Sequence, residues 1–191
     1  MAAVISASEY HKQKSRILKQ IKQGLVFIYP TDTIYGIGCD ATNKDAVARI
    51  RKAKQRDAKP FSVIAPSKSW IAKNCKVTAE ARKWLARLPG PYTLILNLQE
   101  SRCVAENVTQ GSGTLGVRIP GNWSAQIAAT LGKPIVSTSA NLTTQQFMTS
   151  LENLDGGVKQ HVDLIIYEGE KKARPSKLVD LTGKKARIIA R

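Results

Sequence analysis

A short stretch near the start of the chain collects side chains that could bind or act on a ligand. Residues 25–38 read Leu-Val-Phe-Ile-Tyr-Pro-Thr-Asp-Thr-Ile-Tyr-Gly-Ile-Gly and include the hydroxyls of Thr31 and Thr33, the carboxylate of Asp32 and the phenol of Tyr35. The apolar beginning predicts a buried strand that ends at Pro30, because proline has no N–H for a central ladder. Ligands of open α/β sheets bind beyond the carboxyl ends of strands, so this stretch is a candidate site. A polar turn after a core strand is the other interpretation, and the stretch alone does not decide between them.

Cations stand at the end of the helix that we predict next. Asn43 can cap a helix over residues 44–55, where Lys54 and Arg56 are followed closely by Lys59. A point charge and a planar guanidinium so close together suit a triphosphate. Cations at a helix C-terminus also gain from the helix dipole, so a purely structural role stays open.

Two later segments carry polar side chains that share a face. Thr114 and Arg118 lie four residues apart on one predicted strand, and even spacing points both to the same side. An arginine that faces the interior of a sheet protein needs an anion, because burying it unpaired is costly. Ser137, Ser139 and Asn141 alternate in the same way and could hold a ribose or a phosphate. A satisfied loop hydroxyl explains Ser137 alone equally well, but the three together with Arg118 favour a ligand.

Several common kinds of site are missing from the sequence. There is no GxxxxGK[ST] phosphate loop and no GxGxxG after a predicted strand. His11 and His161 have no metal-ligand spacing, and Cys39 has no histidine beside it in the sequence. We therefore expect no metal held by the protein and no covalent mechanism.

The charge balance favours anionic partners. The chain of 191 residues has 30 Lys and Arg against 14 Asp and Glu, a net charge of +16. Such a surplus attracts tRNA or double-stranded RNA, but it does not separate RNA binding from a merely soluble basic surface. The 3 widely spaced cysteines suit a reducing, cytoplasmic compartment, and no apolar run is long enough to suggest a membrane partner.

Interleaved helix and strand patterns predict one mixed α/β domain over residues 1–191. We expect helices at 8–23, at 44–55, after Ser67, after Thr78, from Asn122 to Leu131 and near Leu151, and strands at 25–29, 61–65, 92–98, 115–119, 134–136 and 163–167, before a closing hairpin of 177–181 with 186–190. Gly36 and Gly38 are expected in the loop after the first strand, where they let the backbone bend or approach another group closely.

Five separated motifs occur in a telling order. They are Tyr-Pro-Thr-Asp-Thr-Ile-Tyr-Gly (29–36), Lys54-x-Arg56 before Lys-Pro-Phe (59–61), Pro-Gly-Pro-Tyr-Thr-Leu (89–94), Gly-Val-Arg-Ile-Pro (116–120) and Ser-Thr-Ser-Ala-Asn (137–141). Together they resemble the YrdC/TsaC family of threonylcarbamoyl-AMP synthases. Pro-Ser at 175–176 and Asp-Leu-Thr-Gly at 180–183 extend the likeness, and the length is similar to the short single-domain form.

That resemblance implies both a fold and an activity. The fold is an open twisted mixed β-sheet flanked by helices, with a large concave basic cavity. The activity is that of a nucleotidyltransferase that condenses L-threonine, bicarbonate and ATP to threonylcarbamoyl-adenylate and pyrophosphate. The product serves the t6A modification at position 37 of tRNAs that read ANN codons, together with other proteins of the t6A pathway. Mg²⁺ is expected to arrive with the nucleotide.

Position by position, the resemblance also implies site residues. L-threonine is expected at Thr33, Arg118, Ser137 and Ser176. ATP is expected at Lys54, Arg56, Lys59, Thr114, Ser139, Asn141 and Arg191, with Lys54 and Arg56 as the catalytic residues. Ile64 stands where many members have a histidine, which departs from the pattern.

Two other functions stay open. A non-catalytic module of the same fold could bind double-stranded RNA or tRNA in its basic cavity. The net charge of +16 fits that module and the synthase alike, whereas the hydroxyl clusters fit the synthase alone. A relative with the same fold and a different substrate is disfavoured, because Lys54, Arg56, Ser139 and Asn141 are all retained.

Overall fold

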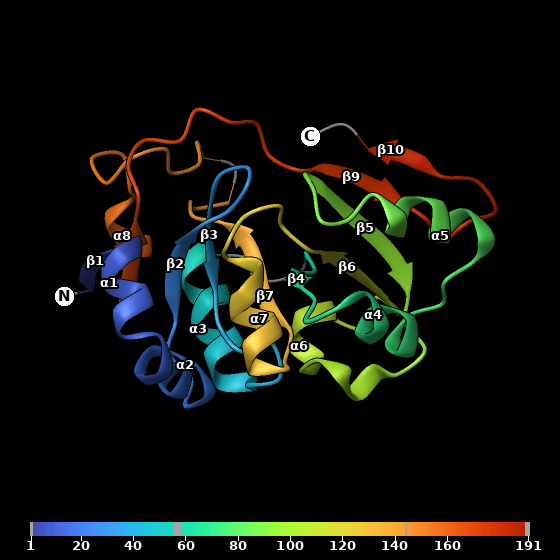
Figure 1. Cartoon of the computed structure of the whole chain (residues 1–191), viewed down its shortest axis with the longest axis horizontal. Coiled ribbons are helices and arrows are strands. Elements are labelled where there is room, and N and C mark those ends of the chain that lie inside the picture. The colour runs from blue at the N-terminus through green and yellow to red at the C-terminus, as the bar shows by residue number, and fades with distance from the viewer. Residues whose placement is uncertain (1, 56–58, 144, 190–191) are drawn as a thin grey trace.

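The computed structural model describes residues 2–55, 59–143 and 145–189, which form a ten-stranded sheet with helices on both faces (Figure 1). The strand order is β1-β8-β2-β3-β7-β4-β6-β5-β9-β10. The strands are β1 (Ala3–Ser6), β2 (Phe27–Pro30), β3 (Tyr35–Gly38), β4 (Ser62–Ile64), β5 (Tyr92–Asn97), β6 (Thr114–Arg118), β7 (Ile135–Ser139), β8 (Leu164–Tyr167), β9 (Lys177–Asp180) and β10 (Arg187–Ile189). The helices are α1 (Ala7–Lys12), α2 (Lys14–Lys22), α3 (Lys44–Lys54), α4 (Lys68–Asn74), α5 (Ala79–Ala86), the 3-10 turn η1 (Ser101–Cys103), α6 (Glu106–Thr109), α7 (Ala125–Leu131) and α8 (Gly156–Lys159).

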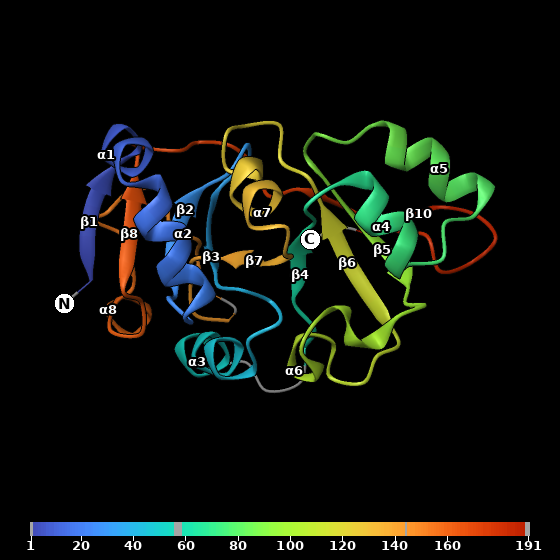
Figure 2. The same cartoon turned by 60° about the horizontal axis from the view of Figure 1, so that its bottom comes forward.

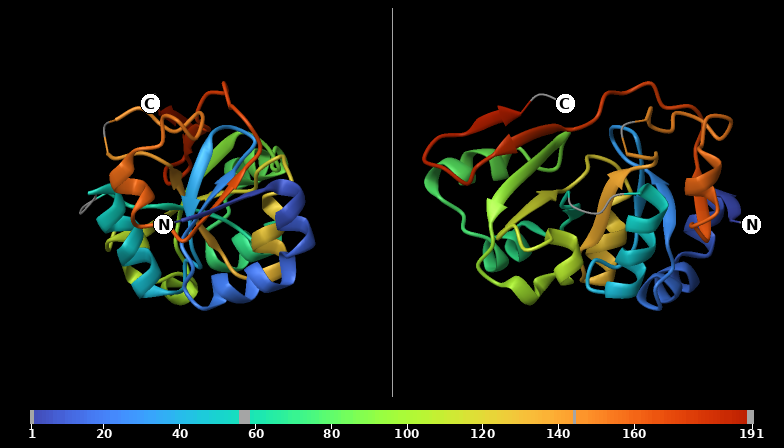
Figure 3. Two further views of the ribbon diagram at one scale, coloured as in Figure 1. Left: turned by 90° about the vertical axis from the view of Figure 1, so that its left-hand side faces the viewer. Right: turned by 180° about the vertical axis from the view of Figure 1, so that it is seen from behind.

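The sheet mixes parallel and antiparallel pairs. β8 runs parallel to β1 and β2, β4 to β6, and β5 to β9, while the other neighbours are antiparallel. Helices α1, α2 and α7 cover one face, and α3, α6 and α8 cover the other (Figures 2 and 3). This open α/β sheet confirms the predicted fold class. None of the helices within the described ranges is long and apolar enough to cross a membrane.

Strand β2 divides the core between the two faces of the sheet. All of its residues are buried, as expected for a run of apolar, β-prone side chains covered on both sides. Phe27 and Tyr29 join one hydrophobic cluster with residues of α2 and α7, whereas Ile28 joins the other with residues of α3. The alternation follows from the two-residue period of a strand.

Side-chain caps that the sequence predicts do begin three helices. The Oδ1 atom of Asn43 accepts from the N–H of Ala46 at 3.0 Å at the start of α3. Ser67 and Thr78 accept from backbone N–H groups three residues on, at 3.0 Å and 3.2 Å, and begin α4 and α5. At the other end of α7, Gly132 adopts the left-handed conformation with φ 66°.

Two predicted helices differ from those in the structure. The single helix expected over 8–23 is broken at Gln13, so that α1 contacts β1 and β8 while α2 contacts α7. Asn122 does not cap the helix after β6, because its amide bonds elsewhere: Nδ2 donates to the carbonyl of Pro30 at 3.2 Å, and Oδ1 accepts from the hydroxyl of Ser124 at 2.7 Å. The helix α7 therefore begins at Ala125, with Ser124 before it.

Three further predictions were wrong. Around Leu151 the described residues form no helix, because the side chain of Asn153 accepts from the N–H groups of Thr149 and Ser150, each at 3.0 Å, and closes a turn. Residues 35–38 are the strand β3 rather than a loop, since they pair with β2 and β7. The edge strand β1 was not expected, because its mostly exposed residues lack an alternating apolar pattern.

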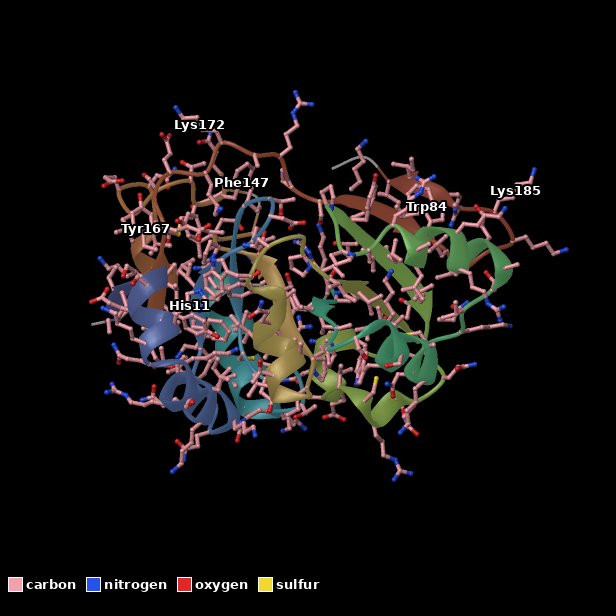
Figure 4. All side chains as sticks on the ribbon, in the orientation of Figure 1. His11, Trp84, Phe147, Tyr167, Lys172 and Lys185 are labelled. Atoms are coloured by element: carbon pink, nitrogen blue, oxygen red, sulfur yellow. The ribbon has the colours of Figure 1, made fainter. Side chains whose placement is uncertain are left out.

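A segment without regular structure, residues 168–176, links β8 to β9 across the top of the molecule in Figure 1; we call it the strap. The hydroxyl of Tyr35 donates to the carbonyl of Gly169 at 2.6 Å and accepts from the N–H of Glu168 at 3.1 Å. The N–H of Lys171 donates to the carbonyl of Thr149 at 2.9 Å. Lys172 points away from the body of the protein (Figure 4). The strap is therefore fixed to β3 near its beginning.

Candidate functional site

A pocket of about 280 Å³ lies where several strands begin or end. The turn after β2 contributes to it, as do β3, β4, β5, β6, β7 and β9. Its lining residues are Thr31, Thr33, Ile34, Tyr35, Gly36, Lys59, Pro60, Phe61, Ser62, Thr93, Arg118, Ser137, Thr138, Ser139, Ser176 and Leu178. Among these lining residues there are two cations, Lys59 and Arg118, and no carboxylate, so the pocket favours an anionic ligand.

The turn after β2 is closed by its own hydroxyl groups. The Oγ1 atom of Thr31 donates to the carbonyl of Ile34 at 2.8 Å and accepts from the N–H of Thr33 at 3.1 Å. The hydroxyls of Thr31 and Thr33 are 2.9 Å apart. Threonine hydroxyls form such local bonds readily, which is why the chain can reverse directly after Pro30. The reversal brings Thr31 and Thr33 to the pocket and leaves Asp32 between them.

Arg118, the last residue of β6, is buried beside that turn with 6% of its surface exposed. Its Nη2 atom donates to Asp32 Oδ1 at 2.5 Å and to the hydroxyl of Thr33 at 3.3 Å. Within the described residues its Nε atom is buried without a hydrogen-bond partner. Burial lowers the pKa of the Arg118 guanidinium and Asp32 acts against that shift, yet arginine stays protonated in proteins. The pocket therefore contains a fixed cation with an unused donor.

The end of β7 forms a second polar group. The hydroxyl of Ser139 donates to Asn141 Oδ1 at 2.6 Å, and Asn141 Nδ2 donates to the carbonyl of Gln145 at 2.6 Å. The ammonium of Lys54, which is 1% exposed, donates to the carbonyls of Ser139 and Asn141 at 2.6 Å and 2.7 Å. It also donates to Asn141 Oδ1 at 3.0 Å. Lys54 thus ties the end of α3 to the loop after β7.

A third polar group closes the pocket from the strap. The hydroxyls of Ser176 and Thr93 are 2.8 Å apart, and both are buried. Tyr29 lies beneath the sheet here, where its hydroxyl donates to the carbonyl of Val136 at 3.2 Å. Burial raises the pKa of Tyr29 to about 12, so this phenol stays protonated at neutral pH and keeps donating.

The structure brings most of the residues expected from the sequence to one place. Thr33, Lys59, Arg118, Ser137, Ser139 and Ser176 all line the pocket. Lys54 and Asn141 are not in the lining but bond to Ser139 or to its loop. Thr114 lies at the opposite end of β6 from Arg118, with its hydroxyl 3.2 Å from that of Ser112, and is also outside the lining. Arg56 and Arg191 lie outside the described residues.

Sequence reasoning gave no role to several residues at the pocket. Asp32, which bonds Arg118, was identified only as one carboxylate in a polar stretch. Thr93 and Thr31 were not singled out for binding, although Thr93 belongs to the Pro-Gly-Pro-Tyr-Thr-Leu motif, which was the available signal. Over the described part of the chain, no group of three or more His, Cys, Asp or Glu could hold a metal ion.

Comparison with protein families and curated sequences gives consistent matches. A family model named Sua5/YciO/YrdC, described as "Telomere recombination", matches residues 19–191. The threonylcarbamoyl-AMP synthase of Vibrio vulnificus (strain YJ016) is 31% identical over 172 residues, which cover 86% of this chain and 91% of that protein. Protein YciO of Escherichia coli (strain K12) is 32% identical over 167 residues, which cover 85% of this chain and 80% of that protein.

Comparison with solved structures gives the same picture. The crystal structure of P. abyssi Sua5 complexed with L-threonine matches with a TM-score of 0.82 and 28% sequence identity, and the match covers 98% of this chain. The chain spans 56% of the length of that Sua5 chain.

Proposed function

The chain belongs to the Sua5/YciO/YrdC family, and from that premise we propose that it is a threonylcarbamoyl-AMP synthase. It condenses L-threonine, bicarbonate and ATP to threonylcarbamoyl-adenylate and pyrophosphate. The product supplies the t6A modification at position 37 of tRNAs that read ANN codons. The Vibrio vulnificus relative has the same activity in its name, and the P. abyssi Sua5 structure contains L-threonine.

One observation carries the proposal: a single cationic pocket is lined by side chains from motifs that are far apart in the sequence. Thr33, Arg118, Ser137 and Ser176 come from four separate strands or turns, and all four line it. Hydroxyl groups and a buried guanidinium suit the hydroxyl and carboxylate of threonine. Lys59 and Ser139 line the same pocket and suit the nucleotide.

The proposed reaction needs positioning and charge compensation. The amine of threonine and bicarbonate form a carbamate with loss of water. A carbamate oxygen then attacks the α-phosphorus of ATP, a new P–O bond forms, the bond to the β-phosphate oxygen breaks, and pyrophosphate leaves. The protein holds the two anions in line and offsets the negative charge of the leaving group. Mg²⁺ enters with the nucleotide and neutralises part of the triphosphate charge.

We assign the residues as follows. Arg118 pairs the carboxylate of threonine, with Thr33, Ser137 and Ser176 beside it. Lys59 and Ser139 bind ATP directly, and Lys54 and Asn141 act through the loop that they fix to Ser139. Thr114, Arg56 and Arg191 stay predictions for ATP, and Arg56 also stays a predicted catalytic residue. Lys54 stays a predicted catalytic residue as well.

The rest of the proposal concerns the setting. We treat residues 1–191 as one domain, because one sheet runs through the described residues. Cys39, Cys75 and Cys103 are free thiols, as is usual in the reducing cytoplasm, where we place the protein. Later proteins of the t6A pathway must consume the adenylate, because a mixed anhydride of this kind is a transient donor.

The test is pyrophosphate release from ATP with all substrates present, with threonine left out, and with bicarbonate left out. We expect release only in the complete mixture. A rate that does not depend on threonine would refute the synthase and would favour a family member with another substrate, the case that the similarity to YciO raises. Leaving out bicarbonate controls for simple ATP hydrolysis.

A second candidate function, RNA binding, is favoured by the surface of α2. This helix carries Lys14, Arg16, Lys19 and Lys22 and contains no acidic residue. Arg16, Lys19 and Lys22 are exposed, and among the described residues none of them forms an ion pair. A row of unpaired cations suits the phosphates of tRNA or double-stranded RNA.

The RNA test replaces Arg16, Lys19 and Lys22 together with glutamine. If they contact phosphates, the slope of log K against log salt should become shallower by about 2 to 3, since each phosphate contact contributes about 0.7–0.9. The control replaces Lys44, Lys83 and Lys172, which have carboxylate partners and carry the same total charge. An equal change in both variants would mean that only net charge matters.

A further inference from the structure

Arg118 and Asp32 form the most buried arginine–carboxylate pair among the described residues. The side chain of Arg118 is 7% exposed and that of Asp32 is 13% exposed. Every other arginine–carboxylate pair includes a side chain that is at least 43% exposed. The two residues are 86 positions apart in the sequence, so the pair is a product of the fold.

The pair uses one edge of the guanidinium and leaves another edge free. Nη2 is taken by Asp32 and Thr33, whereas Nε is buried and has no partner in the described part of the chain. A buried donor without a partner costs about 1–3 kcal/mol, so its presence in a pocket wall indicates a place for a ligand acceptor. Arg118 lines the pocket, and Asp32 does not.

The carboxylate of Asp32 is itself held in place. Its Oδ2 atom accepts from the N–H of Gly121 at 2.8 Å, while Oδ1 accepts from Arg118. Both oxygens therefore face donors, one on β6 and one in the loop after it. Asp32 can fix the direction of the guanidinium because it is fixed by a second element.

We infer that Asp32 is the positioning residue of the amino-acid site: it holds the Nη2 edge of Arg118 so that the remaining N–H groups receive the carboxylate of the substrate. This inference rests on the proposed function for the identity of the substrate. Asp32 also compensates the buried charge when the pocket is empty, because an unpaired arginine at this depth would be costly. It acts through Arg118 and does not touch the ligand.

Replacement by asparagine is informative because of this geometry. The amide of Asp32→Asn has nearly the same shape but only one acceptor atom. Its NH₂ group must face either Arg118 or the N–H of Gly121, and both are donors. One of the two contacts is lost whichever way the amide turns. The guanidinium is then less well fixed, and we expect threonine to bind about 10- to 100-fold more weakly, the range of one hydrogen bond to a charged group.

A matched control is available at another buried carboxylate. Asp40 accepts from Lys133 at 2.7 Å through Oδ2 and from the N–H of Thr42 at 2.8 Å through Oδ1. It is 1% exposed and, like Asp32, does not line the pocket. Asp40→Asn removes the same charge and creates the same mismatch, but not beside Arg118. We expect it to lower stability and to leave threonine affinity within about 2-fold of the wild type.

The experiment titrates L-threonine into the wild type and both variants by calorimetry, and measures KM for threonine and for ATP in the pyrophosphate assay. Positioning predicts a higher dissociation constant and a higher KM for threonine in Asp32→Asn alone, with KM for ATP unchanged. A structural defect would lower kcat through loss of active protein and leave both KM values unchanged. If Asp32→Asn does not fold, Asp32→Glu takes its place, because it keeps the charge and displaces the carboxylate by one methylene.

The outcomes separate this inference from the proposed function. Threonine affinity in the Asp32 variant equal to or higher than that of the wild type overturns the inference, as does an equal loss in Asp40→Asn. Wild-type protein that does not bind threonine at millimolar concentration overturns it too. Wild-type protein that binds threonine without releasing pyrophosphate refutes the synthase, and weaker threonine binding in Asp32→Asn would then still support the positioning role.

Discussion

Gly38 on β3 is the position where the sheet should tolerate a side chain least. A Cβ atom there would lie 2.5 Å from the carbonyl oxygen of Val136 and 2.9 Å from Cε1 of Tyr29. Neither neighbour can move easily. Val136 belongs to β7, which pairs with β3 on one side and β4 on the other, and the ring of Tyr29 is fully buried. Gly38→Ala must therefore push β3 away from β7 or shift the ring.

The expected loss follows from overpacking. Adding one methyl group to a well-packed interior costs about 1–3 kcal/mol and occasionally more. We expect the upper end, about 3 kcal/mol, because one of the opposing atoms is backbone in the middle of the sheet. For a chain of this size, 1 kcal/mol corresponds to about 2–4 °C in Tm, so Tm should fall by about 6–12 °C.

The matched control is Gly36→Ala, two residues away on the same face of the same strand. Its Cβ would meet Cζ of Tyr29 at 3.4 Å and the carbonyl oxygen of Thr138 at 3.5 Å, which is close to ordinary contact. Urea unfolding of both variants measures the free energy of unfolding, and the control should stay within about 1 kcal/mol of the wild type. The reasoning is wrong if Gly38→Ala is equally mild, or if both substitutions cost the same.

Two further predictions concern charged groups. Lys54→Met keeps a long apolar stem but removes the ammonium from the carbonyls of Ser139 and Asn141; we expect a loss of about 2–4 kcal/mol in urea unfolding and a higher KM for ATP, and an unchanged Tm would contradict the tethering role. The hydroxyl and then the N–H of Thr182 lower the pKa of Asp180. A lowered pKa means that the carboxylate stabilises the fold above the unfolded pKa of about 3.9 and that this contribution is lost as the pH falls through the folded value. The stability gap between wild type and Asp180→Asn should therefore be constant near neutral pH and shrink below about pH 4, whereas a gap independent of pH would contradict the assignment.

Local features of the fold were predictable from the sequence because their partners are close in the chain. Asn43, Ser67 and Thr78 each find a backbone N–H three residues on, so composition alone places these caps. The helix expected near Leu151 failed for the same kind of reason. There the side chain of Asn153 also bonds locally, but it closes a turn, and the sequence offers both uses to an asparagine.

Features of the site were predictable only in part, because their partners are distant. The cost of burying Arg118 indicates that an anion must face it, and this much needs no structure. That the anion in the protein is Asp32, and that one donor of the guanidinium is still unused, depends on how β6 and the turn after β2 meet. In the same way the glycine at 38 predicts a close approach, but not that the atom approached belongs to Val136.

The place of β7 in the sheet explains why one pocket can serve two substrates. β7 has β1, β8, β2 and β3 on one side and β4, β6, β5, β9 and β10 on the other. Residues that line the pocket come from both sides and from β7 itself, including Tyr35 of β3, Ser62 of β4 and Ser139 of β7. The strap crosses between the same two sides and delivers Ser176. An amino acid at Arg118 and a nucleotide at Ser139 would then be held by groups that only the joining of the two sides brings together, so the rigidity of β7 sets the relative position of the reacting atoms.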